Sequence, residues 1–236
     1  MKNKLSKRMQ KVAALVDSTK AYSLVDALKK VKEYSSECAA KFDESVEMVM
    51  ELGIDARQTD QAVRGSEVMP SGLGKAVKVA VFVSEDKIKA AKDAGADIAG
   101  ADELVELVKA GKAGDFDVCI ATPDMMGKVG LLGKVLGPKG LMPNAKLGTL
   151  TPDFAAAIKN VKAGQVSYKN EKGGIVHAGV GKMSFSEEAL KANIVALYNA
   201  VLRSKPTTSK GVYMRNVYIS TTMGPSIKLD LQSMVS

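Results

Sequence analysis

Apolar and polar positions in the first part of the chain repeat with a helical period and then with a period of two. The stretch from Leu5 to Val16 predicts one helix, and a second helix begins at Ser23, where Asp26 stands in a capping-box-like position. Between Lys41 and Leu52 nearly every second residue is apolar, which predicts a half-buried strand with a charged outer face. A shorter strand follows over residues 61–69.

The middle of the chain has a different pattern, in which short runs that are apolar on both faces alternate with helical segments. The predicted strands are Ala76–Val83, Ala96–Ala99 and Phe116–Ala121, and the predicted helices begin at Ser84, Asp102 and Asp124. Such alternation is typical of a parallel sheet covered by helices on both sides. A last helix reaches Lys162, with Thr151 as N-cap, Pro152 in the first turn and Gly164 at its end.

After Gln165 the period of two returns. Residues 165–170 and 174–178 predict a hairpin around Glu171-Lys172-Gly173, and Ser184 with Glu187 is expected to cap a long helix that ends before Pro206. The stretch from Gly211 to Pro225 is rich in Val, Ile, Tyr and Thr and predicts a final strand. Because its apolar residues change parity, this strand needs a bulge near residues 215 and 216.

These patterns predict a fold that is part α+β and part α/β. We expect both ends of the chain, residues 1–72 and 165–236, to form one discontinuous two-layer α+β domain whose strands complete a single sheet backed by helices. Residues 73–164 are expected to form an inserted three-layer, Rossmann-like α/β domain. Two hinge segments, near Pro70–Gly74 and near Gly164, join the predicted domains and favour relative motion.

The net charge of +8 is placed unevenly along the chain. Residues 1–72 carry 12 Lys and Arg against 11 Asp and Glu, residues 73–164 carry 13 against 11, and residues 165–236 carry 9 against 4. Basic surfaces gather nucleic acids through phosphate contacts and counterion release. The excess near the C-terminus therefore favours a polyanionic partner, although a net charge of this size also serves solubility alone.

Enzymatic motifs are absent from the sequence. No Gly-Lys pair has the upstream glycine of a phosphate-binding loop, and no G-x-G-x-x-G stands after a predicted strand. Cys38 and Cys119 lie in apolar segments and His177 is the only histidine, so we expect no catalytic residue, no metal site and no cofactor. No apolar run is long enough to span a membrane, and we expect no secretory signal at the basic start. The two cysteines are far apart in apolar segments, so a disulfide framework is not expected and a reducing cytoplasm is favoured.

The remaining candidates are basic and polar groups at strand ends. Lys41 and Phe42, the hairpin tip at residues 169–172, and Arg215 with the turn at 220–224 are expected to meet along one edge of the split domain. Lysines would contact phosphates and hydroxyls the riboses, which suits a folded RNA recognised by shape. Phe42 either contacts the ligand or packs in the core, because its parity matches the core residues. The loop from Gly133 to Asn144 is either an anion-facing loop or a well-specified turn.

Several short motifs resemble one known family. They are Leu136-Gly137-Pro138-Lys139-Gly140-Leu141-Met142-Pro143-Asn144, Thr122-Pro123-Asp124, Lys41-Phe42-Asp43-Glu44, Val63-Arg64-Gly65 and Thr221-Thr222-Met223-Gly224-Pro225. In unbroken order from about Lys7 to Ile227, the sequence resembles the bacterial "L one" family of large-subunit ribosomal proteins, which form the mobile side stalk. The run from Gly137 to Asn144 is the most specific of these motifs.

The resemblance implies a set of partners and contact residues. The implied partners are large-subunit rRNA in the stalk, the large ribosomal subunit, deacylated tRNA leaving the exit site and the protein's own operon mRNA, which it would repress as a free monomer. The implied RNA-binding residues are Lys41, Phe42, Ser45, Lys169, Asn170, Glu171, Lys172, Asn216, Thr222, Met223 and Gly224. Ser45 keeps the hydroxyl of a threonine found in relatives, whereas Lys32 stands where a relative can have glutamate, which leaves a contact at that position open.

Overall fold

The computed structural model describes residues 10–11, 15–17, 19–38, 40–110 and 116–234. It contains helices and both parallel and antiparallel sheets, so the fold is mixed. The chain divides into two compact units. One consists of the described residues up to Gly74 together with those from Val166 onward, and the other is Lys75–Gln165.

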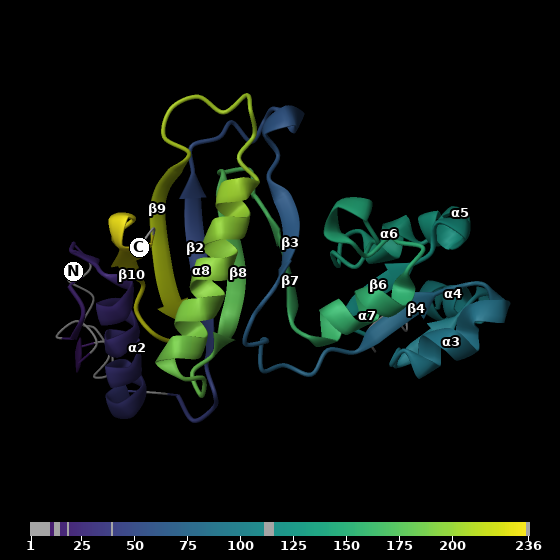
Figure 1. The fold of residues 1–236 in the computed structure, drawn as a ribbon, viewed down its shortest axis with the longest axis horizontal. Helices are drawn as coiled ribbons and strands as arrows, with labels where there is room; N and C mark the ends of the chain where they lie inside the picture. Colours follow the sequence, from purple (N-terminus) through teal and green to yellow (C-terminus); the bar gives the residue numbers. More distant parts are fainter. Residues whose placement is uncertain (1–9, 12–14, 18, 39, 111–115, 235–236) are drawn as a thin grey trace, which may run out of the picture. The chain divides into compact units, whose positions relative to one another are not determined.

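The first unit is built on a five-stranded sheet with one face covered by two helices (Figure 1). The strand order is β1 (Ala21–Tyr22), β10 (Ile227–Leu229), β9 (Met214–Thr221), β2 (Ser45–Leu52) and β8 (Ile175–Lys182). The covering helices are α2 (Leu24–Cys38) and α8 (Glu187–Arg203). Alternate residues of β2, among them Val46, Met48 and Met50, are fully buried against the helices, as their period of two predicted.

Two further strands form a separate small sheet, so the prediction of a single sheet and a simple hairpin was wrong. β3 (Arg64–Val68) pairs with β7 (Gln165–Lys169), while β8 pairs with β2. The turn that joins β7 to β8 keeps only a bridge between Asn170 and Val176 and a 2.8 Å hydrogen bond from the Glu171 N–H to the Ile175 carbonyl. Alternation in a sequence shows which face of a strand is buried, but it does not show which strand is its neighbour.

Strand β7 is joined to α8 through Tyr168. The Tyr168 hydroxyl donates to the carbonyl of Ala200 at 3.2 Å, and Tyr168 is buried. The bulge predicted in the last strand is confirmed. Glu51 pairs with Asn216 and Leu52 with Met214, so the residue between the two partners is passed over in the register.

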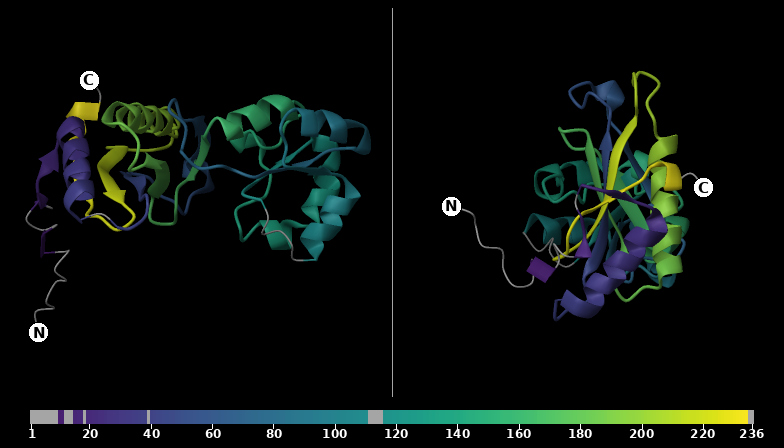
Figure 2. Two further views of the ribbon diagram at one scale, coloured as in Figure 1. Left: turned by 90° about the horizontal axis from the view of Figure 1, so that it is seen from below. Right: turned by 90° about the vertical axis from the view of Figure 1, so that its left-hand side faces the viewer.

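The second unit is a parallel sheet between two layers of helices (Figure 2), as the sequence predicted. The strand order is β5 (Ile98–Gly100), β4 (Val79–Phe82) and β6 (Val118–Ala121). Ala80 and Phe82 pack on one side, and Val79 and Val81 on the other. The first side is covered by α4 (Asp102–Lys109), α5 (Met126–Gly130) and α6 (Gly133–Leu136), and the second by α3 (Ile88–Asp93) and α7 (Phe154–Lys162).

One of the predicted helix caps is confirmed and two lie elsewhere. Ser23 caps α2, because its Oγ accepts from the Asp26 N–H at 3.2 Å and donates to the Asp26 carboxylate at 2.7 Å. The cap of α7 is Asp153 rather than Thr151, and the cap of α8 is Ser186 rather than Ser184. In both cases two residues of capping type stand two positions apart, and the apolar period does not choose between them.

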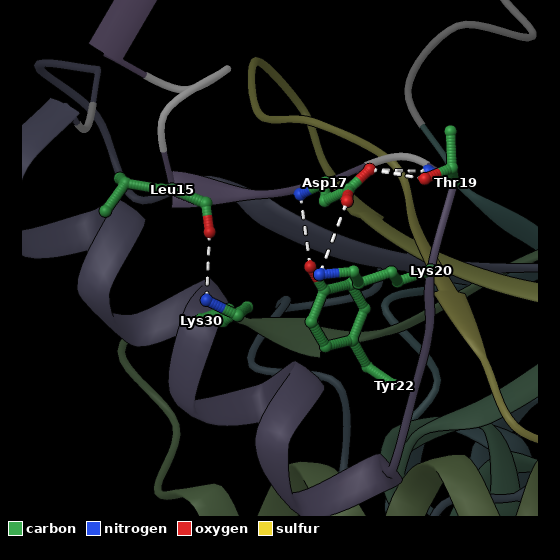
Figure 3. A network of polar contacts seen from close by, with 6 residues as sticks. All are labelled: Leu15, Asp17, Thr19, Lys20, Tyr22 and Lys30. Carbon is green, nitrogen blue, oxygen red and sulfur yellow. Dashed lines mark hydrogen bonds and ion pairs between the residues drawn. The ribbon is translucent and has the colours of Figure 1, made fainter.

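The predicted helix over Leu5–Val16 lies mostly outside the described residues. Leu15 near its end and Asp17 just after it are joined to α2 and β1 by polar contacts (Figure 3). Lys30 of α2 donates to the Leu15 carbonyl at 2.9 Å, and the Asp17 N–H donates to the Tyr22 hydroxyl at 3.1 Å. Within the described ranges, no helix combines the length and the apolar character needed to cross a lipid bilayer.

Candidate nucleic-acid interface

The face of the five-stranded sheet that points away from α2 and α8 is partly or fully exposed. Along β2 it runs from Ser45 to Glu51, a length of about 20 Å at the usual rise of a strand. Neighbouring strands add residues to it in rows: Lys182, Ser45 and Thr222; Gly179, Glu47 and Ser220; His177, Val49, Tyr218 and Lys228; and Ile175, Glu51 and Asn216. The predicted contact residues lie at the two ends of this face.

The first group, which we call the Phe42–Met223 cluster, consists of Lys41, Phe42, Ser45, Thr222, Met223 and Gly224. Ser45 begins β2 and Thr222 follows β9, and the two are joined by hydrogen bonds from the Ser45 N–H to the Thr222 Oγ1 at 3.0 Å and from the Thr222 N–H to the Ser45 carbonyl at 3.1 Å. Phe42 and Met223 are 55% and 44% exposed. Two large apolar side chains therefore stand in solvent beside hydroxyls and a lysine.

The position of Phe42 decides between the two alternatives left open by the sequence. Strand β2 begins only at Ser45, so the parity of the strand does not extend back to Phe42. Its side chain is exposed and borders an open hollow of about 400 Å³, which is also lined by Ala40, Asp43 and Met183. Packing in the core is therefore wrong for Phe42, and its surface is free for a ligand.

The second group, the Lys169–Lys172 turn with Asn216, lies at the other end of the face. The Asn216 amide donates to Glu51 at 2.7 Å, and the turn borders a hollow of about 710 Å³. Lys169, Glu171 and Lys172 are exposed, but Asn170 is buried and its Oδ1 accepts from the Val63 N–H at 2.8 Å. Asn170 thus holds the turn in place, and the predicted residues form two groups rather than one edge.

Glu44 is a residue of the site that sequence reasoning missed. It is 1% exposed, and its carboxylate accepts from the Tyr34 hydroxyl at 3.2 Å, the Ala40 N–H at 3.0 Å and the Met223 N–H at 3.0 Å. Burial acts to raise the pKa of Glu44, but the hydrogen bonds outweigh burial and the pKa is lowered. One signal was present, since Glu44 stands at the core parity of the strand pattern, between Phe42 and Val46.

Gly224 is required by the protein itself. A Cβ atom at this position would overlap the Thr221 hydroxyl and lie 3.1 Å from the ring of Tyr34. The backbone of the turn therefore approaches helix α2 more closely than any side chain permits. This explains the glycine without a ligand.

Lys32 and Lys182 donate hydrogen bonds to protein groups near the Phe42–Met223 cluster. The Lys32 ammonium donates to the carbonyls of Met183 and Phe185, so in this chain the lysine binds the protein's own loop. Lys182 donates to the Ser45 hydroxyl at 2.9 Å. Ser45 keeps further hydrogen-bonding capacity, because a hydroxyl has one donor and two acceptor positions.

The described residues offer no reactive centre. Among them, no three His, Cys, Asp or Glu side chains gather as metal ligands do. Cys38 and Cys119 are buried, and burial raises the pKa of the Cys119 thiol to about 12, which keeps it protonated.

Comparison with known proteins decides the family. The sequence model of the ribosomal protein L1p/L10e family matches residues 31–225. The chain is 56% identical over 232 residues to the large ribosomal subunit protein uL1 of Nitrosomonas europaea, with 98% of this chain and 99% of that protein covered. It is 53% identical to the protein of the same name from Janthinobacterium sp. (99% of each covered) and 54% identical to that of Aromatoleum aromaticum (98% and 97% covered). The chain belongs to the ribosomal protein L1p/L10e family.

Membership of the L1p/L10e family confirms the resemblance found in the sequence. Its members are ribosomal proteins and not enzymes, which agrees with the missing catalytic motifs. The matched residues include both groups at the ends of the sheet face and stop one residue after Gly224.

Proposed function

We propose that this L1p/L10e chain is a structural component of the large ribosomal subunit and binds large-subunit rRNA in the mobile stalk beside the tRNA exit site. One observation carries the proposal: the chain is 53–56% identical, over nearly its whole length, to relatives named large ribosomal subunit protein uL1. The two groups at the ends of the exposed sheet face supply suitable chemistry. On this basis the protein is associated with the ribosome.

The contacts we propose follow from the residue types. Lys41, Lys169 and Lys172 are exposed cations suited to phosphate oxygens, and phosphate contacts supply affinity with little sequence information. The hydroxyls of Ser45 and Thr222 suit ribose 2′-hydroxyls. Phe42 and Met223 present apolar surface against which a ribose or an unstacked base can pack. With two groups about 20 Å apart along one strand, the surface would recognise the shape of a folded RNA.

Each predicted site residue has a place in this proposal. Those that we propose as direct contacts are Lys41, Phe42, Ser45, Lys169, Glu171, Lys172, Asn216, Thr222 and Met223. Asn170 and Gly224 act indirectly, since the buried Asn170 amide fixes one turn and the missing side chain of Gly224 permits the other.

The proposal is tested by binding to a stalk-region rRNA fragment across a salt series, with an unrelated duplex RNA as the control. We expect clear preference for the stalk fragment and a loss of affinity of several-fold or more as salt is raised, because released counterions contribute to binding. Equal, weak binding to both RNAs would reduce the protein to a non-specific polycation. Preference without salt dependence would favour a protein-protein adaptor that meets RNA only indirectly.

We further propose that the chain assists release of deacylated tRNA from the exit site. The support is the family resemblance together with the grouping of the chain into two compact units joined by two segments. The test compares tRNA dissociation from ribosomes assembled with and without the protein, where slower release without it is the expected result. Equal rates would remove this part of the proposal.

Repression of the protein's own operon is the second function we propose. It is supported by the resemblance, in which an mRNA structure imitates the rRNA site and would use the same surface. An operon leader fused to a reporter should be repressed when the protein is supplied in excess, and Phe42→Ala should relieve the repression. A reporter that does not respond to the protein would restrict its role to the ribosome.

A further inference from the structure

The Glu44 carboxylate joins three chain segments that are far apart in the sequence. Its oxygens accept from Tyr34 in helix α2, from the backbone of Ala40 before strand β2 and from the backbone of Met223 after strand β9. The carbonyl of Glu44 also accepts from the Met183 N–H at 2.9 Å. Two of these contacts involve Ala40 and Met223, which stand next to or within the Phe42–Met223 cluster, and the Phe42 and Met223 side chains of that cluster are exposed.

Burial of this carboxylate is unusual because its bonded partners are neutral. Within the described part of the chain, no lysine or arginine forms an ion pair with Glu44, and its residue is 1% exposed. A buried charge costs free energy unless hydrogen bonds replace its lost hydration. The pKa of Glu44 is nevertheless lowered, because its hydrogen bonds outweigh the opposing effect of burial. The site is therefore built to hold an ionised carboxylate in one geometry.

The packing of the core does not depend on the hydrogen bonds that Glu44 accepts. Helix α2 and strands β2 and β9 already pack through fully buried residues such as Leu28, Met48 and Ile219. The hydrogen bonds of Glu44 instead order two segments whose side chains, Phe42 and Met223, point to solvent. Ordering an exposed turn costs conformational entropy during folding. A turn that is already ordered in its bound geometry loses less entropy when it binds a ligand, so it binds more tightly.

We propose that Glu44 is a positioning residue for RNA binding: its carboxylate fixes the Thr222–Gly224 turn against the segment that carries Lys41 and Phe42, so that Phe42 and Met223 meet the RNA together. This inference rests on the proposed RNA-binding function. Glu44 itself is buried and does not touch the RNA.

The first variant is Glu44→Gln, which keeps the size of the side chain. Its amide has a single carbonyl oxygen, so an NH₂ group replaces one of the two oxygens that accept hydrogen bonds in Glu44. We expect stalk-rRNA binding to weaken by roughly tenfold to a hundredfold, as for the loss of a hydrogen bond to a charged group. The Met223 amide should also lose its protection from hydrogen exchange, while protection of the central β2 amides remains.

A matched control separates positioning from general stability. Val201→Ala removes buried volume at the far end of α8, where the Val201 carbonyl accepts from Tyr213 rather than from the cluster. Binding is measured well below the unfolding temperature of each variant, so that all of them are folded. Val201→Ala should lower the unfolding temperature and leave RNA affinity within about twofold of the parent, since the cluster keeps its geometry.

A double-mutant cycle with Met223→Ala tests the route of the effect. If Glu44 acts through the turn, the double variant binds about as weakly as the weaker single variant, because both changes disable the same contact. Independent losses that multiply would overturn the inference, and so would a folded Glu44→Gln variant with parental affinity. Should Glu44→Gln fail to fold, Glu44→Asp replaces it in the cycle, since it keeps the charge and withdraws the carboxylate by one methylene. If the parent protein does not prefer the stalk fragment, the proposed function fails first.

Discussion

At the scale of single residues, exposure distinguishes the residues that we propose as RNA contacts from the buried residues that hold their segments in place. Phe42 and Met223 are large, apolar and about half exposed, whereas Glu44 and Asn170 are polar and buried. Each pair is the opposite of what residue type alone favours. Exposed apolar groups beside buried polar ones indicate a surface shaped for a partner, with its framework held from beneath.

Replacement of Phe42 by alanine should weaken RNA binding without unfolding the protein. Because the ring is 55% exposed, its removal should change the free energy of unfolding by no more than about 0.5 kcal/mol. Loss of an apolar or stacking contact should cost about 1–3 kcal/mol of binding free energy. Urea unfolding and rRNA titration of the same preparation measure both quantities. A stable variant with unchanged affinity would show that the ring faces solvent in the complex.

Gly224→Ala should affect both stability and binding. The new methyl group would overlap the Thr221 hydroxyl and approach the Tyr34 ring, so the turn must move away from α2. We expect a loss of about 1–3 kcal/mol in the free energy of unfolding, as for other overpacked sites. Gly173→Ala is a suitable control, because a Cβ there meets only Ile175 at 3.8 Å or more. If Gly224→Ala were as stable as this control, the turn would accommodate the methyl group, and the predicted overlap would be wrong.

The sequence predicted residues whose type suits contact with RNA, and it missed Glu44, which is exceptional only because it is buried. Lys41, Phe42 and the Thr222–Gly224 turn were proposed as contacts because basic, apolar and hydroxyl groups at strand ends suit RNA and because the family resemblance implies them. Glu44 was passed over, although its core parity was visible, because a glutamate beside a strand is normally solvated. Its partners Tyr34 and Met223 are 10 and 179 residues away in the chain. The sequence does not show that the fold brings these residues together.

At the scale of elements, the periodic pattern predicted well which segments form helices and strands. It predicted poorly which strands pair with one another. Strands β2 and β9, the bulge in β9 and the three parallel strands of residues 75–165 were all expected. Strands β1 and β10, with two and three residues, were too short for a pattern to show. The partner of β7 was mistaken because a short turn favours a hairpin, whereas β7 pairs with β3, which is distant in the sequence.

Helix α8 also carries a buried amide that fixes the segment leading out of the first unit. Asn193 is fully buried, and its Nδ2 donates to the carbonyls of Gly72 and Val180 at 2.9 and 2.7 Å while its Oδ1 accepts from the Ser71 N–H at 3.0 Å. The amide therefore anchors the start of the predicted hinge to α8 and β8. No periodic pattern distinguishes this asparagine from an exposed one.

Asn193→Ala should destabilise the first unit by about 1–3 kcal/mol, because three backbone groups lose their partner and the Val180 carbonyl among them is buried. Asn199→Ala is the matched control on the same helix, since Asn199 is not fully buried and the change improves helix propensity. Chemical denaturation followed by circular dichroism measures both. Equal midpoints for the two variants would mean that water replaces the amide at no cost.

At the scale of the whole molecule, charge and candidate contacts coincide. Residues 1–72 and 165–236 carry net charges of +1 and +5, against +2 for residues 73–164. Both groups of candidate contacts belong to the first unit, as do the buried residues that hold them. Under the proposed function, we therefore expect the first unit to bind RNA without a contribution from residues 75–165.

A chain in which a flexible Gly/Ser linker replaces residues 75–165 should therefore keep most of the RNA affinity, within about tenfold or 1.4 kcal/mol of the full chain. The isolated segment 75–165 should bind stalk rRNA no better than an unrelated duplex, because its smaller net charge supports only non-specific contacts. Titrations at a single salt concentration, with circular dichroism to establish folding, compare the three chains. The hypothesis fails if the isolated segment binds as tightly as the full chain. Weak binding by both parts would mean that the RNA needs contacts from both units at once, and the +2 unit would then share in recognition.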